Sequence, residues 1–267
     1  MRTRLGVLPL ALALAGPASA APPLTLVSTT TTRDSGLLDH LLPRFEAESG
    51  ISVRVISVGT GQALALGRRG DADVLLVHDR ASEDAFVAEG LALFRRDVMY
   101  NDFVLVGPAA DPAQLRGLRD ASAALARIAE RRAAFVSRGD ESGTHKAELR
   151  LWRQAGIDPR AASGTWYRET GSGMGATLTT ANELTAYTLT DRGTWLASRR
   201  RGGLVLFVEA GAALRNAYGV LVVNPARHPH VQAELATRFA DWITSPAGKA
   251  AIESFRIDGE VAFHAAP

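Results

Sequence analysis

A nine-residue loop in the middle of the chain places the strongest constraint on the fold. Residues 137–145 read Ser-Arg-Gly-Asp-Glu-Ser-Gly-Thr-His and lie between an apolar run, 133–136, and an amphipathic run, 146–154. The apolar run predicts a buried strand, and the amphipathic run predicts a helix that begins near Ser142. The sequence therefore predicts a strand, a polar loop and a helix in succession.

The same loop carries groups suited to binding an oxyanion. Ser142, Gly143 and Thr144 stand at the predicted helix start, where backbone N–H groups lack helical partners and the helix dipole is positive. Arg138 adds a fixed charge and a planar fork of donors that suits a tetrahedral oxyanion. A simpler interpretation is a Ser/Thr helix cap beside a surface arginine.

A run of four threonines follows the first predicted strand. The apolar residues 24–28 predict this strand, and apolar residues at helical spacing over 37–45 predict a helix after it. The hydroxyls of Thr30 and Thr31 can cap the helix or donate to a bound oxygen. A redundant cap explains the run taken alone, but its combination with the Arg138 loop favours an anion site.

A third unit begins with the predicted strand 51–58. Gly59-Thr60-Gly61-Gln62 follows this strand and opens a short predicted helix, 63–67. The glycines let backbone N–H groups approach a ligand closely, and Thr60 adds a hydroxyl. Thr60 and Gly61 are therefore candidate ligand-binding residues, although a plain turn explains a lone Gly-Thr-Gly as well.

A glycine-rich turn in the second half of the chain is a candidate for a further wall of the site. Gly171-Ser172-Gly173-Met174-Gly175 precedes a predicted helix that reaches Asn182. The backbone of Gly173 and Met174 can contact a ligand there. A structural turn accounts for the same residues equally well.

These loops together resemble a known family. Arg138-x-Asp140-x-Ser142-Gly143-Thr144 looks like the oxyanion-binding loop of periplasmic phosphate-binding proteins. Longer stretches are similar to the tungstate-binding subunits of ABC importers, with weaker similarity onward to Phe263. These stretches are STTTTRDSGLLDHLLPRFE, VGTGQALALGRRGDADVLLVH, VMYNDFVLVGP, SRGDESGTHKAELRLW and AYTLTDRGTWLA.

The resemblance implies an α/β fold of the type 2 periplasmic binding proteins, with two lobes that are each a mostly parallel sheet flanked by helices. It implies that residues 21–107 and 223–267 form lobe I, and that 108–222 form lobe II. The hinge is expected near 107–109 and 209–222. Such paired hinge segments let two lobes close on a ligand by small backbone rotations.

The resemblance also implies the ligand and the partner. The ligand is expected to be tungstate or molybdate, bound through its oxygens without a cofactor or a cation site. The partner is expected to be the transmembrane permease subunit of an ABC importer. The predicted ligand-binding residues are Thr30, Thr31, Thr60, Gly61, Arg138, Ser142, Gly143, Thr144, Gly173 and Met174.

Asp140 leaves phosphate open as an alternative ligand. In the phosphate-binding proteins the acidic residue at this position accepts the proton of the phosphate. Tungstate and molybdate are unprotonated at neutral pH, so a close carboxylate would repel them. The wider similarity favours tungstate, with Asp140 orienting Arg138 or the loop, but the sequence does not separate tungstate from molybdate.

An enzyme is the competing class of function. Ser142, His145 and Asp140 have the residue types of a nucleophilic triad, but one loop and the first helix turn do not build the required line of three groups. The chain has no G-x-S-x-G, no H-x-x-x-H and no clustered carboxylates of a metal-dependent phosphatase. We therefore expect a binding protein and not an enzyme, with a periplasmic hydrolase as a distant alternative. A ligand-free adaptor would leave the Thr, Gly and Arg loops unexplained.

Residues 1–20 have the three-part order of an export signal. Arg2 and Arg4 precede an apolar core, 5–15, and a small-residue cleavage site, 18–20, and the whole is too short for a membrane span. The 30 basic residues outnumber the 28 acidic ones by these two arginines, so the rest is formally neutral and offers no basic surface for nucleic acid or membrane. The chain has no cysteine, which excludes disulfides and a lipid anchor on cysteine. We expect an exported, periplasmic monomer.

Four other polar residues receive structural interpretations. Asp73, just before the apolar run 74–77, is expected to cap or pair inside its lobe. His78 is interpreted as a loop histidine, with a side chain that faces the cleft between the lobes as the alternative. Asp191 and Arg192 are expected to pair with each other and hold the second lobe together.

Overall fold

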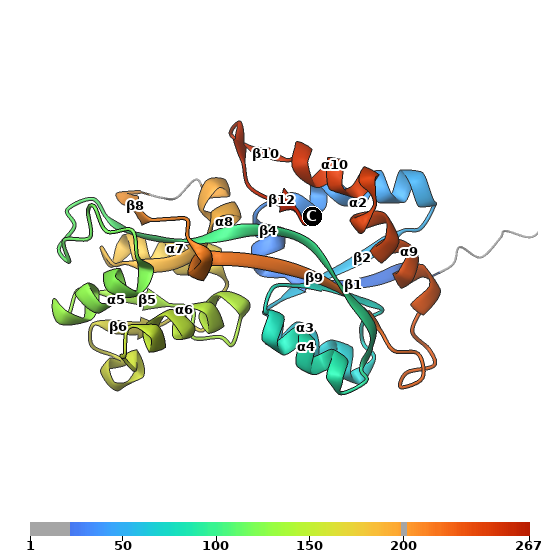
Figure 1. Ribbon diagram of the computed structural model, residues 1–267, viewed down its shortest axis with the longest axis horizontal. Helices are drawn as coiled ribbons and strands as arrows, with labels where there is room; N and C mark the ends of the chain where they lie inside the picture. The colour runs from blue at the N-terminus through green and yellow to red at the C-terminus, as the bar shows by residue number, and fades with distance from the viewer. Residues whose placement is uncertain (1–21, 199–201) are drawn as a thin grey trace, which may run out of the picture.

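The computed structural model describes residues 22–198 and 202–267. The predicted export signal, residues 1–20, lies outside this range. None of the helices in the described residues is long and apolar enough to span a membrane. The chain forms two lobes, lobe I and lobe II, joined by a pair of long strands (Figure 1).

The two long strands run through the middle of the molecule (Figure 1). β4 (Ala92–Pro108) and β9 (Arg215–Val223) pair antiparallel as far as Asp102, which lies opposite Arg215. From Phe103 onward β4 pairs with strands β7 and β8 of lobe II. β4 thus belongs to the sheet of lobe I in its first part and to the sheet of lobe II in its last part.

Lobe I contains a sheet in the order β12-β4-β9-β3-β1-β2. β1 pairs in parallel with β2 and β3, and each of these three strands is followed by a helix after at most two residues. The pairs β3–β9, β9–β4 and β4–β12 are antiparallel. The bounds are β1 Leu24–Thr29, α1 Thr30–Asp34, α2 Leu37–Ser49, β2 Val53–Val58, α3 Thr60–Arg69, β3 Val74–Val77, α4 Arg80–Ala88, α9 Ala233–Thr244, α10 Pro246–Ser254, β10 Arg256–Ile257, β11 Glu260–Val261 and β12 His264–Ala265.

Lobe II is built around the end of β4. β7 and β8 pair antiparallel with β4, whereas β5 and β6 pair in parallel with each other. α5 packs against α6, and α7 packs against β5 and β7. The bounds are α5 Ala121–Glu130, β5 Phe135–Ser137, α6 Gly143–Gln154, β6 Tyr167–Glu169, α7 Met174–Glu183, β7 Thr188–Asp191, α8 Arg192–Ala197 and β8 Leu204–Val208, with short 3-10 turns at Pro159–Ala162 and Ala212–Leu214.

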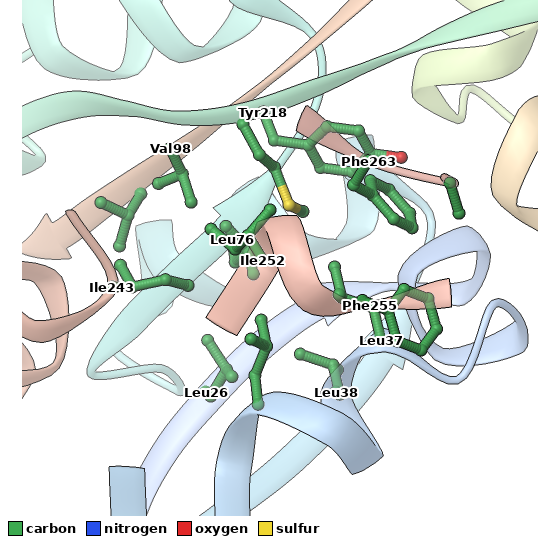
Figure 2. Close-up of a cluster of buried hydrophobic side chains, with 14 of the residues drawn as sticks. Leu26, Leu37, Leu38, Leu76, Val98, Tyr218, Ile243, Ile252, Phe255 and Phe263 are labelled. Atoms are coloured by element: carbon green, nitrogen blue, oxygen red, sulfur yellow. The ribbon is translucent and has the colours of Figure 1, made fainter. Parts of the chain in front are cut away.

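Alternating residues of the lobe I sheet face two separate apolar clusters. Leu26 and Leu76 face a cluster with α2, α9 and α10, in which Phe263 and Tyr218 also lie (Figure 2). Val27 faces the opposite cluster, which covers the sheet with α3 and α4. Because successive strand residues point to opposite faces, this pattern fixes which helices cover which side of the sheet.

The first of these clusters continues into lobe II. Met174 and Leu178 of α7 and Trp195 of α8 belong to it, together with the lobe I residues. α1 also packs against α7 and α8. The two lobes are therefore in contact around the start of α1, in addition to being joined by β4 and β9.

The predicted two-lobed α/β architecture is confirmed, with two differences in detail. The sheets are mixed and not mostly parallel, because both long strands pair antiparallel with their neighbours. Residues 190–195, for which no helix or strand was predicted, contain the end of β7 and most of α8. Asp191 explains the helix, since its side chain accepts from the Thr194 N–H and caps it.

Candidate anion-binding site

The loop between β5 and α6 is held in shape by its own side chains. Arg138 is 2% exposed, and its Nη2 donates to Asp140 Oδ2 at 2.5 Å. Asp140 Oδ1 accepts from the Ser142 N–H at 3.2 Å, and Ser142 Oγ accepts from the His145 N–H at 3.2 Å and caps α6. Both oxygens of Asp140 are thus engaged within the loop, where they orient Arg138 and the start of α6.

The starts of α3 and α6 lie against each other across the two lobes. A Cβ built on Gly59, which begins α3, would lie 3.6 Å from the Ser142 Cα. A Cβ on Gly143 would lie 2.7 Å from the His78 carbonyl oxygen, which is closer than real Cβ atoms approach. Glycine at 143 therefore permits lobe I to reach the first turn of α6.

α1 and α7 begin at the same place. Thr30 Oγ1 of lobe I accepts from Arg138 Nη2 of lobe II at 3.4 Å, a long contact. Gly173 begins α7, and a Cβ built on it would lie 3.8 Å from the side chain of Thr30. Met174 is fully buried and its side chain lies in the apolar cluster that the lobes share, so the side chain is not available to a ligand.

Four buried polar atoms in these loops have no partner among the described residues: Thr60 Oγ1, Arg138 Nε, Thr144 Oγ1 and His145 Nε2. Leaving a buried donor unpaired costs roughly 1–3 kcal/mol per group. Two hydroxyls and a guanidinium N–H can all donate. Thr60 comes from lobe I and the other three residues come from lobe II, so the unpaired atoms lie on both sides of the contact between the lobes.

His145 adds a donor because its tautomer is fixed by the loop. Its Nδ1 accepts from the Glu141 N–H at 3.2 Å, so a neutral ring carries its proton on Nε2. Burial is the largest effect on the ring and lowers the pKa of His145, which favours this neutral form. The four unpaired atoms are therefore all hydrogen-bond donors. The sequence interpretation did not include His145 among the candidate donors, although its place after Ser-Gly-Thr in the first helix turn was a usable signal.

Thr31 lies in a different environment from Thr30. Its hydroxyl is fully buried, 2.8 Å from Thr29 Oγ1 and 3.1 Å from His78 Nε2. His78 Nδ1 is in turn 2.9 Å from Asn216 Oδ1 on β9. The hydroxyl of Thr31 is thus engaged in a chain of hydrogen bonds that reaches one of the two connecting strands.

His78 follows β3 in a loop, as interpreted, but it is only 3% exposed. Its ring stacks on Tyr218 at 4.8 Å between centroids. Burial, partly opposed by the hydrogen bond to Asn216, lowers the pKa of His78 to about 4, so the ring is neutral at physiological pH. A signal was present: β1 and β3 are parallel neighbours, so the residues after them meet at one sheet edge.

Two structural interpretations have different outcomes. The structural role of Asp73 is confirmed, since its carboxylate accepts from the N–H groups of Thr25 at 2.7 Å and Gln232 at 2.8 Å. The predicted pair of Asp191 with Arg192 is wrong. Asp191 is fully buried at the end of β7, where it accepts from the Thr194 N–H and hydroxyl and caps α8, whereas Arg192 begins α8 and donates to other carboxylates.

Arg192 binds the connecting strand β4 instead. It donates to Asp102 Oδ1 at 2.6 Å and to Asp102 Oδ2 at 2.7 Å. This pair borders a cavity of ≈ 670 Å³ that Tyr100 and Arg215 also line. None of the four unpaired donors lines this cavity, so size alone does not make it the anion site.

The geometry gives no nucleophilic pair in the Arg138 loop. Ser142 contacts His145 through the backbone N–H of that residue, and the His145 ring is bound to Glu141. Over 22–198 and 202–267, no group of three or more His, Asp or Glu side chains is placed to hold a metal ion.

The chain is similar to known proteins along most of its length. A family model described as PBP superfamily domain matches residues 16–247. The tungstate-binding protein TupA of Peptoclostridium acidaminophilum is 47% identical over 263 residues, which cover 93% of this chain and 91% of that protein. A putative ABC transporter anion-binding protein of Haloferax volcanii is 49% identical over 245 residues, which cover 90% of this chain and 71% of that protein.

Two solved structures share the fold at high sequence identity. The tungstate ABC transporter structure from Geobacter sulfurreducens is 50% identical with a TM-score of 0.80, and the match covers 87% of this chain and 98% of that one. The tungstate-binding protein TupA from Desulfovibrio alaskensis G20 is 44% identical with a TM-score of 0.77, and the match covers 92% of this chain and 99% of that one.

Proposed function

Because this chain belongs to the family of the tungstate-binding proteins TupA, within the PBP superfamily, we propose that it captures tungstate between its lobes and delivers it to an ABC permease. Molybdate is the closest alternative ligand. We propose further that residues 1–20 export the protein, which works in the periplasm as a monomer without a cofactor.

The observation that carries the proposal is the set of unpaired buried donors. Thr60 of lobe I and Arg138 and Thr144 of lobe II belong to the loops that meet between the lobes, and each has a buried donor atom without a partner among the described residues. A buried dianion is stable only when many hydrogen bonds replace its hydration. The N-termini of α3 and α6 add free N–H groups and the positive ends of two helix dipoles.

The state of Asp140 favours tungstate over phosphate. Phosphate carries a proton that requires an acceptor, whereas tungstate needs only donors. Both oxygens of Asp140 already accept hydrogen bonds, from Arg138 and from the Ser142 N–H, which supports a role in orienting the loop and not in binding the ligand. Tungstate is also larger than phosphate, so a cage fitted to it would leave phosphate with stretched hydrogen bonds.

We propose these roles for the predicted site residues. Arg138, Thr60 and Thr144 bind the ligand by their side chains, and His145 joins them through Nε2. Thr31 acts indirectly, because its hydroxyl is hydrogen-bonded to His78 and not directed at the ligand. The remaining contacts are assigned to the Thr30 hydroxyl and to the loop backbones or capping groups of Gly61, Ser142, Gly143, Gly173 and Met174.

We place the hinge where β4 changes partner. Asp102 is the last residue of β4 opposite β9, and Phe103 is the first opposite β7. Arg215, opposite Asp102, starts the return strand. Rotation at these points would separate Thr60 from Arg138 and admit the ligand. The first hinge segment is therefore placed a few residues before 107–109, the segment expected from the sequence.

Isothermal titration calorimetry of the purified protein against four oxyanions tests the function. We expect tight binding of tungstate, measurable binding of molybdate and little heat from sulfate or phosphate. Phosphate that displaces tungstate at comparable concentration would contradict the assignment and favour a phosphate-binding protein.

A further inference from the structure

A buried carboxylate of lobe I is bound by two cations of lobe II, away from the predicted ligand contacts. Asp79 follows β3, precedes α4 and is 4% exposed. Its Oδ1 accepts from Arg150 Nη1 at 3.0 Å, and its Oδ2 lies 3.5 Å from Lys146 Nζ. Ser82 completes the cluster, because its hydroxyl accepts from Lys146 Nζ at 2.8 Å and donates to Asp79 Oδ2 at 2.5 Å.

The cluster joins the two lobes and not two parts of one lobe. α4 belongs to lobe I and α6 belongs to lobe II, and both lie on the same side of the long strands (Figure 1). Lys146 and Arg150 are four residues apart on α6, so they share one face of the helix. The Asp79 side chain makes no capping bond to α4, so its oxygens serve Ser82 and lobe II.

The charges of lobe II stabilise the buried Asp79 carboxylate only while the two lobes are in contact. Burial by itself raises the pKa of the carboxyl, but the Ser82 hydrogen bond and the charges of Lys146 and Arg150 outweigh it and hold the pKa below its ordinary value. The side chains of Lys146 and Arg150 are 27% and 46% exposed, so both reach solvent beside the buried carboxylate. Separation of the lobes would return all three charges to water.

We propose that Asp79, Lys146 and Arg150 form an ion-pair latch that exists only when the lobes are closed and that sets how long a bound oxyanion is retained. This inference rests on the proposed function of the cleft. The same helix α6 presents its N-terminus to the ligand and its Lys146–Arg150 face to lobe I. Closure on the ligand therefore also closes the latch.

A latch and a direct ligand contact differ in how they affect the affinities for tungstate and molybdate. It stabilises the closed form whichever anion is bound, so it raises the affinity for tungstate and molybdate by the same factor. Its removal speeds dissociation and leaves the ratio of the two affinities unchanged. A substitution that altered direct ligand contacts would change that ratio.

The test compares Asp79→Asn with Asp84→Asn. Asp84 is the control because it lies on α4, the helix that Asp79 precedes, is half exposed and pairs with Arg80 inside lobe I. We expect Asp79→Asn to dissociate tungstate about tenfold faster than the wild type, within the range usual for coupled sites. Asp84→Asn should dissociate tungstate at the wild-type rate.

Lys146→Gln repeats the test from the other lobe and leaves the loop around His78 untouched. We expect the same acceleration, and the double variant Asp79→Asn/Lys146→Gln should lose less than the sum of the two single effects. Circular dichroism and thermal unfolding check that each variant is folded. Wild-type dissociation rates in both single variants, or a changed tungstate-to-molybdate ratio, would overturn the latch.

A second readout keeps the latch separate from the proposed function. The chain has no cysteine, so Ala88→Cys on α4 and Gln154→Cys on α6, both exposed, accept spin labels that report the distance between the lobes. Without ligand, Asp79→Asn should lose the short-distance fraction seen in the parent. If the wild type fails to bind tungstate, the proposed function fails, but an unchanged distance distribution in Asp79→Asn is what contradicts the latch.

Discussion

Replacement of Arg138 by alanine should remove most tungstate binding while the protein stays folded. The side chain is 2% exposed, donates to Asp140 and Thr30, and has an unpaired Nε. Arg138→Ala deletes a charged donor to the ligand and also frees a carboxylate beside a dianion. Truncating a buried charge-assisted partner costs about 2–5 kcal/mol. The dissociation constant should therefore rise by roughly 30-fold to several thousand-fold.

Competition calorimetry with two further variants separates the two parts of this loss. Arg138→Ala/Asp140→Ala should recover part of the affinity, because the freed carboxylate is gone. Arg160→Ala is a control, since Arg160 is an exposed arginine of lobe II paired with Asp158, and it should bind as the wild type does. Affinity of Arg138→Ala within about threefold of the wild type, far below the cost of losing such a pair, would refute the placement of Arg138 in the site.

Three further outcomes are expected. Thr60→Val should weaken tungstate binding by about tenfold in calorimetry, without loss of thermal stability, because its buried hydroxyl has no partner in the described protein; a stability loss with unchanged affinity would contradict a ligand role. Asp140→Asn should change tungstate affinity by less than about fivefold, because the lost Arg138 contact and the removed negative charge act in opposite directions. A much larger gain in tungstate affinity would indicate that the Asp140 carboxylate lies against the ligand and repels it. Burial lowers the pKa of His78 to about 4 from 6.5, so the neutral ring contributes to stability above pH 6.5, and this contribution is lost as the pH falls towards 4. Denaturant titration should therefore show that the free energy of unfolding falls less over this pH range in His78→Gln than in the wild type. Equal losses in the two proteins would contradict the assigned neutral ring.

The local units of the fold could be predicted from the sequence because their signals are local. A buried apolar run, a loop of Thr, Gly or Ser and an amphipathic run identify β1, β2 and β5 with the helices that follow them. Asp191 with Thr194 shows where such reasoning falls short. The capping residue of α8 was visible, but the helix is only Arg192–Ala197, too short for a periodic pattern to stand out.

The sequence could not predict which threonine of the run 29–32 directs its hydroxyl at the other lobe. Successive residues on a helix point about 100° apart, so the residue at which α1 begins decides which hydroxyl faces the other lobe. α1 begins at Thr30, which contacts Arg138, while Thr31 turns to His78. That start depends on how β1 pairs with its neighbours, which is tertiary information.

Contacts between the lobes are the feature that is hardest to predict from the sequence. Asp79 and Arg150 are 71 residues apart in the chain and meet only because β4 and β9 bring α4 and α6 together. The mixed pairing of the sheets has the same origin. The antiparallel return of β9 between β3 and β4 leaves no local signal in its apolar sequence.

Anomalous diffraction from crystals grown with tungstate tests the central claim most directly. At the tungsten absorption edge the metal gives a peak that no other atom of the protein can produce. We predict one peak between the lobes, with its oxygens within hydrogen-bonding distance of Thr60 Oγ1, Arg138 Nε and Thr144 Oγ1. A peak in the cavity beside Tyr100 and Arg192, or none between the lobes in crystals of protein saturated with tungstate, would contradict the account.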